Sequence, residues 1–213
     1  MPDYIFDLDG TLADSSHEVI NCLKLAFQQA GYYVAKERFS SDIMGPPMRQ
    51  IVKNAAPELT DERIIETVVK NYRQIYDYDE NDVTKLYDGI YDFLLSEKSA
   101  GSKLFVATFK PKLPTSRLLK ALKIDALLDD VYCVDKFDVP LSKTEMIEDI
   151  VKKYSLDKSK TYMIGDRDND IIAAKEAGVK AAAALWGYGD DKTFIKENAD
   201  ISISHISQLK RLK

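Results

Sequence analysis

The chain has 213 residues, of which 45% are hydrophobic and 31% are charged. This length and composition are typical of a soluble globular protein with a full core, built as one domain or as one domain with a modest insertion. The formal net charge of −5 argues against a protein that binds nucleic acid through a basic face.

The two cysteines, Cys22 and Cys133, belong to no Cys-x-x-Cys or Cys/His cluster, so we expect buried packing residues and no structural zinc site. No apolar run is long enough to cross a bilayer, which argues against a membrane protein. The first strand is expected to begin at about the third residue, which leaves no room for a signal peptide. Together these features predict a cytoplasmic protein.

The first half of the chain turns helical after one short strand. The apolar run Tyr4-Ile5-Phe6 predicts that strand, and apolar residues then recur at helical spacing up to about residue 85. The helical segments span 17–30, 47–56 and 60–78. The acidic stretch 77–82 is interpreted as a solvated hinge at the end of this helical region.

The second half alternates short apolar runs with amphipathic stretches, which is typical of βαβ units and a parallel sheet. Its predicted strands span 103–108, 130–134, 161–164 and 179–185. The last of them is predicted although its alanine run by itself favours a helix. We therefore expect an α/β fold in which residues 1–14 and 85–213 form the core and residues 15–84 form a helical insertion.

Reactive side chains follow the predicted strands. In open parallel sheets, ligands bind outside the carboxyl ends of the strands, near a topological switch point. The groups that follow strands here are Asp7 with Asp9, Thr108, Lys143 at the start of a helix, and Asp166 with Asp170. We expect these groups to meet at one edge of the sheet.

The first pair of carboxylates carries the strongest chemical signal. In an extended backbone residues i and i+2 point to the same side, so Asp7 and Asp9 would share one site. Two like charges held that close repel unless a cation or a shared proton relieves them. Gly10 permits the sharp change of chain direction that such a site needs. This pattern indicates a bound metal and chemistry on a negatively charged substrate.

The order of these motifs resembles that of the haloacid dehalogenase-like (HAD) phosphohydrolases. The matching elements are Asp7-Leu8-Asp9-Gly10-Thr11-Leu12-Ala13-Asp14-Ser15, a strand ending in Thr108, then Lys143, and the segment from Gly165 to Gly178. Three stretches resemble the phosphoglycolate phosphatase-like branch: Thr108-Phe109-Lys110-Pro111, Gly45-Pro46-Pro47 and Leu185-Trp186-Gly187-Tyr188-Gly189. The resemblance implies a Rossmann-like parallel sheet core with an inserted cap similar to the family's four-helix cap.

The resemblance and the chemistry of phosphoryl transfer assign the same roles to the first motif. Asp7 is the candidate nucleophile, which would form an aspartyl-phosphate. Asp9 would protonate the leaving oxygen and later take a proton from the attacking water. Mg²⁺ suits an all-oxygen site. Its expected ligands are the Asp7 and Asp166 carboxylates and the backbone carbonyl of Asp9, and Asp170 would orient a metal-bound water or Lys143.

The remaining roles concern the phosphoryl group. Thr108 and the backbone N–H groups of Leu8 and Phe109 would hold phosphoryl oxygens, and Lys143 would neutralise both the nucleophile and the phosphoryl group. Phe109 stands where the branch has a small polar residue, so its ring is expected to pack under the cap or to narrow the pocket.

Several residues also have simpler interpretations. Lys110 and Lys112 are interpreted as solvated loop lysines, although they could attract an anionic leaving group. Arg49 could grip a substrate carboxylate or second phosphate, or it could form a surface ion pair. Taken alone, Asp166 and Asp170 could simply cap a helix.

The predicted function is a Mg²⁺-dependent phosphatase of a small phosphorylated metabolite, with phosphoglycolate as the first choice. Alternatives within the branch are a nucleotide phosphatase or a pyrophosphatase, and a phosphomutase similar to β-phosphoglucomutase shares the same motifs. Asp9 disfavours a haloacid dehalogenase, which has no phosphate leaving group to protonate. The catalytic residues argue against a non-enzymatic binding module. A monomer or loose dimer is expected.

Overall fold

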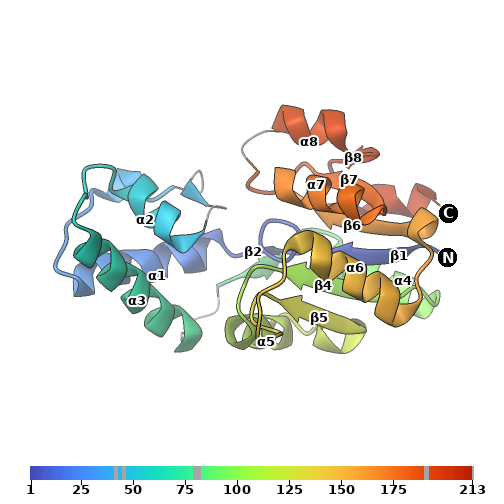
Figure 1. Cartoon of the computed structure of the whole chain (residues 1–213), viewed down its shortest axis with the longest axis horizontal. Helices are drawn as coiled ribbons and strands as arrows, with labels where there is room; N and C mark the ends of the chain where they lie inside the picture. The colour runs from blue at the N-terminus through green and yellow to red at the C-terminus, as the bar shows by residue number, and fades with distance from the viewer. Residues whose placement is uncertain (41–42, 45–46, 79–82, 190–191, 213) are drawn as a thin grey trace. The chain divides into compact units, whose positions relative to one another are not determined.

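A computed structural model describes the chain except for residues 41–42, 45–46, 79–82, 190–191 and 213, and the side chains of residues 211–212. The chain forms two compact units (Figure 1). The first contains Met1–Asp14 and Lys85–Lys213, and the second contains Ser15–Thr84. Two features of the sequence analysis, the Gly45-Pro46 pair and most of the acidic stretch at 77–82, lie outside the described residues.

The first unit is built on a six-stranded sheet with the order β5-β4-β1-β6-β7-β8, in which every neighbouring pair is parallel. The strands are β1 (Asp3–Phe6), β4 (Leu104–Thr108), β5 (Asp130–Cys133), β6 (Thr161–Gly165), β7 (Lys180–Ala184) and β8 (Ile201–Ile203). This topology confirms the predicted α/β class. The alanine-rich strand β7 forms as predicted, because a position between two parallel neighbours outweighs its helical propensity.

Three strands were not predicted. The edge strand β8 has only three residues, too few for a periodic signal. A short antiparallel pair, β2 (Ala13–Asp14) with β3 (Lys85–Leu86), joins the two segments of the chain where they leave and re-enter the first unit. Two-residue strands leave no pattern in a sequence, and this pairing spans the whole insertion.

Helices cover both faces of the sheet (Figure 1). The helices of this unit are α4 (Ile90–Ser99), α5 (Lys112–Ala121), η3 (Asp125–Leu127), α6 (Lys143–Tyr154), η4 (Lys158–Lys160), α7 (Asp168–Ala177), α8 (Lys192–Asn198) and η5 (Ile206–Leu212). Side chains alternate along β1, so Tyr4 and Phe6 pack with α4 and α5, whereas Ile5 packs with α6 and α7. A strand buried on both faces is uniformly apolar for this reason.

The strand order decides where a ligand site can form. The chain passes from β1 to β4 on one side of it, continues outward to β5, and then returns to β6 on the other side of β1. This reversal is the switch point at which open α/β sheets bind ligands. Phe6 is in register with Val106 on β4 and with Ile164 on β6, so the residues that follow these three strands emerge side by side.

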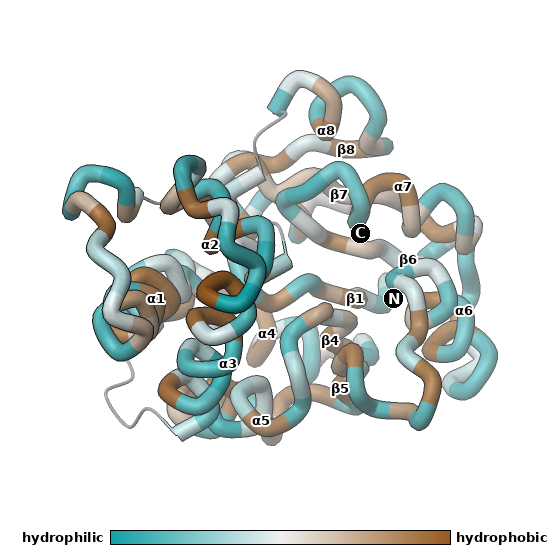
Figure 2. Tube along the Cα trace, turned by 60° about the vertical axis from the view of Figure 1, so that its left-hand side comes forward, coloured by the Kyte–Doolittle hydropathy of each residue, from teal (hydrophilic) through white to brown (hydrophobic). Residues whose placement is uncertain are grey.

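The second unit is helical. It contains α1 (Ser16–Gln29), η1 (Lys36–Arg38), α2 (Met48–Ala55) and α3 (Glu62–Tyr78). The α-helices in the described part of this unit are α1, α2 and α3, and the four-helix cap implied by the resemblance stays a prediction. Its buried residues include Phe27, Ile65 and Tyr72. Brown apolar and teal polar segments alternate along its helices, as amphipathic helices require (Figure 2).

None of the helices in the described part of the chain combines the length and the apolar character that a membrane crossing demands.

Candidate active site

Asp7 is the first residue after β1, and it is buried. Its backbone N–H donates to the carbonyl of Ile164 at 2.9 Å, so the chain stays attached to β6 at this point. This bond places the carboxylate at the carboxyl edge of the central strand, where the sequence predicted it.

A tight turn follows Asp7. The carbonyl of Leu8 accepts hydrogen bonds from the N–H groups of Leu12 and Ala13, each at 3.0 Å. Gly10 adopts a φ of +87°, and a Cβ at this position would lie 2.5 Å from Oδ2 of Asp166. Both observations require glycine here, because the backbone is left-handed and the neighbouring carboxylate leaves no room.

Lys143 enters the site from the first position of α6. A capping box determines where that helix begins: the Ser142 hydroxyl accepts from the Glu145 N–H at 3.2 Å, and the Glu145 carboxylate accepts from the Ser142 N–H at 2.7 Å. Because the capping box makes Ser142 the N-cap, Lys143 is the first residue of the helix.

The Lys143 ammonium contacts three oxygens. Its Nζ lies 2.6 Å from Oδ1 of Asp7, 2.9 Å from the carbonyl of Ala107 and 3.0 Å from Oδ1 of Asp170. The side chain is only 4% exposed, so this lysine is not a solvated one. A buried ammonium requires such partners, because an unpaired buried charge is strongly unfavourable.

Asp166 follows β6 and is held through both of its carboxylate oxygens. Oδ1 accepts the Thr11 hydroxyl at 3.0 Å, and Oδ2 accepts the backbone N–H groups of Tyr188 at 2.7 Å and Gly189 at 3.1 Å. The residue is fully buried. Its carboxylate is therefore fixed in place by the first motif on one side and by the loop after β7 on the other.

Asp170 stands in the first turn of α7, where Oδ2 accepts the N–H of Arg167 at 3.2 Å. It thus does cap a helix, as the simpler interpretation stated, but it also forms an ion pair with Lys143. Gly165 is required beneath it, because a Cβ there would collide with the Asp170 side chain.

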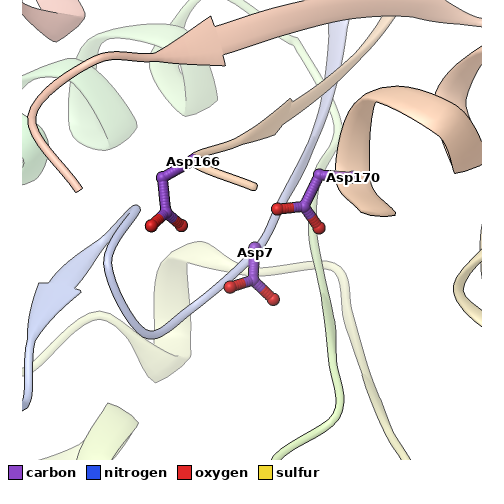
Figure 3. A group of neighbouring side chains, drawn as sticks. All are labelled: Asp7, Asp166 and Asp170. Carbon is purple, nitrogen blue, oxygen red and sulfur yellow. The ribbon is translucent and has the colours of Figure 1, made fainter. Parts of the chain in front are cut away.

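Asp7, Asp166 and Asp170 form a cluster of carboxylates from the ends of β1 and β6 and the start of α7 (Figure 3). One oxygen from each lies within 4.8 Å of the others. Oxygens around one hard cation stand at most about 4 to 5 Å apart, so this donor set fits a cation that prefers oxygen ligands. Asp9 was predicted to contribute its backbone carbonyl, and its side chain is not part of this cluster.

Burial makes these carboxyl groups unusually basic. Burial raises the pKa of Asp7 to about 7, although Lys143 acts in the opposite direction. Burial and then the charge of Asp7 raise the pKa of Asp166 to about 6, and burial raises the pKa of Asp170 above its usual range. Burial thus disfavours three ionised carboxylates side by side, and a bound cation would favour their ionised forms.

Asp9 forms an ion pair with Lys110. Nζ of Lys110 lies 3.0 Å from Oδ1 and 3.3 Å from Oδ2 of Asp9. The lysine side chain is 6% exposed, whereas that of Asp9 is 28% exposed. The prediction that Lys110 is a solvated loop lysine is therefore wrong: it turns inward to the first motif.

The predicted phosphoryl-binding residues lie at the same edge. Thr108 ends β4 and is buried, and its hydroxyl accepts the backbone N–H of Lys110 at 3.2 Å. Phe109 is 47% exposed as a residue, and the Lys143 ammonium lies 5.1 Å from the centre of its ring. Leu8 buries its side chain in the core beside the turn that it anchors. Their roles toward a phosphoryl group stay predictions.

Comparison with known proteins decides the family. Residues 4–184 match the haloacid dehalogenase-like hydrolase family, which is most of the chain. The chain belongs to this family. Its relatives include the pyrophosphatase PpaX of Halalkalibacterium halodurans, 28% identical over 88% of this chain and 85% of the relative. The phosphoglycolate phosphatase of Aquifex aeolicus is 29% identical over 98% of this chain and 94% of the relative.

A solved structure extends the comparison to the fold. The protein tyrosine kinase A (PtkA) of Mycobacterium tuberculosis aligns with a TM-score of 0.81 and 27% identity, covering 99% of this chain and 97% of that one. The family match and the phosphatase relatives make the chain an enzyme of the hydrolase class, although the name of this structural neighbour states a kinase activity.

Arg49 lies in the second unit of this HAD-like hydrolase, at the start of α2. Its guanidinium forms ion pairs with Glu62 and Glu66 in the first turns of α3. The side chain is 43% exposed. The surface ion pair considered in the sequence analysis is thus present, and a role toward substrate stays a prediction.

Three contributors to the HAD site were not predicted from the sequence. Thr11 and the loop Trp186–Gly189 hold Asp166, and Lys110 contacts Asp9. The two glycines of this loop were the signal in the sequence that its backbone lies close to another group. In the structure both glycines approach Asp166 so closely that a Cβ would collide with it. The sequence gives no sign that Lys110 is buried beyond its position shortly after Thr108, because the burial of one lysine leaves no sequence pattern.

Proposed function

We propose that the chain is a Mg²⁺-dependent phosphatase of a small phosphomonoester that acts through an aspartyl-phosphate on Asp7. One observation carries the proposal: a buried carboxylate at the carboxyl end of the central strand contacts a buried lysine at 2.6 Å and shares a donor cluster with Asp166 and Asp170. Phosphoryl transfer requires positioning and compensating positive charge, which such a site offers. The relatives named as phosphatases support the same reaction.

The reaction has two steps. An Asp7 oxygen attacks phosphorus, the bond from phosphorus to the leaving oxygen breaks, and the leaving oxygen keeps that electron pair and takes a proton from Asp9. Water then attacks the aspartyl-phosphate and gives a proton back to Asp9, and the electron pair of the broken bond returns to Asp7. Lys143 counters the negative charge that builds up on the phosphoryl oxygens.

The metal would be held by Asp7 and Asp166 with the backbone carbonyl of Asp9, and Asp170 would orient Lys143, with which it forms an ion pair at 3.0 Å. Mg²⁺ suits this donor set because it prefers oxygen ligands and binds substrate phosphates as well. When bound, the cation supplies positive charge to the transferring phosphoryl group. Thr108 and the N–H groups of Leu8 and Phe109 would bind the remaining phosphoryl oxygens.

The substrate proposed first is phosphoglycolate or a metabolite like it. Nucleotide phosphatase and pyrophosphatase activities are the alternatives within the branch, and a β-phosphoglucomutase-like mutase is the alternative outside hydrolysis. The test is a screen of phosphorylated metabolites with Mg²⁺ that measures free phosphate and isomerised sugar phosphate side by side. Stoichiometric phosphate release supports the phosphatase, whereas isomerisation without phosphate release supports the mutase. No turnover of any phosphate ester would contradict both.

Residues 15–84 are proposed to act as the cap, with Arg49 as a contact for an anionic substrate group. Arg49→Ala should raise KM for a substrate with a second anionic group by about 5- to 20-fold and leave kcat nearly unchanged. The reason is that the lost contact stabilises the bound substrate and the transition state equally. Steady-state kinetics on one doubly and one singly anionic substrate measure this. An unchanged KM for both would assign Arg49 only to its ion pairs with Glu62 and Glu66. A cytoplasmic location and a monomeric or loosely dimeric state stay predictions.

A further inference from the structure

The first two aspartates of the first motif, Asp7 and Asp9, contact different buried lysines. Asp7 contacts Lys143 at 2.6 Å, and Asp9 contacts Lys110 at 3.0 Å and 3.3 Å. The two lysines come from different parts of the sheet edge, Lys143 from the start of α6 and Lys110 from the segment after β4. The Asp7 and Asp9 carboxylates therefore have separate cationic partners.

The backbone around Lys110 is held by local contacts, and its side chain is buried. Its backbone N–H donates to the hydroxyl of Thr108, and Pro111 caps the following helix with extended backbone. With 6% of the side chain exposed, the ammonium is out of bulk water, so leaving its partner would expose an uncompensated buried charge. This cost keeps the lysine on the Asp9 carboxylate.

Asp9, by contrast, stays reachable. Its side chain is 28% exposed, so the carboxylate side chain is accessible to substrate or water although Lys110 contacts it. Because Nζ lies within hydrogen-bonding distance of both oxygens, one oxygen can keep the lysine's hydrogen bond while the other carries a proton. The contact is thus compatible with both protonation states of a group that must give and take a proton.

We propose that Lys110 is the positioning residue of Asp9, holding its carboxylate in the orientation that proton transfer requires. The inference rests on the proposed function, since it assigns Lys110 to the acid–base partner of that reaction. A bound anion on Lys110 itself is the competing role, and it is disfavoured because the ammonium is already buried against Asp9.

The test separates the two steps of the reaction. With p-nitrophenyl phosphate and Mg²⁺, the leaving group departs easily without an acid, so formation of the phosphoenzyme is insensitive to Asp9, whereas its hydrolysis is not. Lys110→Met keeps the length of the side chain and removes its charge. We expect it to slow phosphoenzyme decay by roughly 10- to 100-fold, with a burst of p-nitrophenolate, because a small displacement of a proton-transfer group has effects of this size.

Two comparisons make the result specific. Lys112→Met, at an exposed lysine two residues further on, is the matched control and should change the decay by less than about twofold. In an Asp9→Asn background, Lys110→Met should add no further slowing beyond about twofold, because a residue that acts through Asp9 has nothing left to position. Lys110→Arg, which keeps a cation, should restore part of the decay rate.

Other outcomes would overturn the inference. Equal slowing by Lys110→Met with and without Asp9 would assign the lysine a separate role, and a rise in KM alone would make it a substrate contact. Unchanged decay would remove any role. If Lys110→Met lowers the unfolding temperature too far for assay, the Lys110→Arg and Asp9→Asn pair decides by the same criterion. Failure of the proposed function is distinct: the unmodified enzyme would then form no phosphoenzyme at all.

Discussion

An Asp7→Asn variant should form no phosphoenzyme and should lose phosphate release by at least about 10⁴-fold, because an amide cannot replace the carboxylate as nucleophile. The fold should survive. The substitution removes a charge from a buried position, and Lys143 keeps its contacts with Asp170 and the carbonyl of Ala107. Phosphate release and trapping of labelled phosphoenzyme measure the loss, and calorimetry measures the unfolding temperature.

Asp3→Asn is the matched control for this variant. Asp3 begins the same strand, and its carboxylate accepts the N–H of Lys103 at 2.8 Å, at the opposite end of the strand from Asp7. It should keep activity within about twofold while losing a little stability, on the order of 1 kcal/mol. Full turnover by Asp7→Asn, or equal inactivation of both variants, would contradict the assignment of the nucleophile.

Removal of divalent metal should abolish activity, and added Mg²⁺ should restore it. The reason is electrostatic: the Asp7, Asp166 and Asp170 carboxyl groups are buried together, and without a cation burial raises the pKa of each above its usual range. Dialysis against a chelator followed by Mg²⁺ titration measures this dependence. Asp166→Asn should weaken Mg²⁺ binding by roughly 10- to 100-fold, since it removes an oxygen that is otherwise ready to coordinate.

Stability provides a readout of the metal that does not depend on activity. In the metal-free protein the pKa of Asp7 is raised to about 7 and that of Asp166 to about 6, so the folded state holds protons that the unfolded chain has released. Stability should therefore fall as pH rises from about 4 to about 7. Because Mg²⁺ competes with these protons, its stabilising effect should grow across the same range, to about 2.7 kcal/mol at a metal concentration 100 times Kd.

Unfolding temperatures measured with and without Mg²⁺ across this pH range test the linkage. A stabilisation by Mg²⁺ that is the same at pH 5 and pH 8 would show that the cation binds elsewhere. Full activity in excess chelator would contradict the metal site itself. The Asp166→Asn variant serves as the internal control, because its stability should respond much less to the cation.

Much of this molecule could be predicted from local sequence patterns. Short apolar runs identified β1, β4, β5, β6 and β7, and helical spacing identified α1, α2 and α3. The rule that ligands bind at strand ends predicts that Asp7, Thr108 and Asp166 lie at one edge of the sheet. Strands and helices depend on residues that are close together in the sequence, so a single sequence is enough to predict them.

What only the tertiary structure decided concerns partners that are far apart in sequence. Asp9 and Lys110 are separated by 101 positions, and Thr11 and Asp166 by 155, and no pattern in one sequence pairs them. Burial follows from the same long-range packing, so the sequence around Lys110 predicts a solvated side chain although the structure buries it. The sequence by itself determined most strands and helices and the residue types that the chemistry needs. The packing at the edge of the sheet determined which lysine pairs with which aspartate.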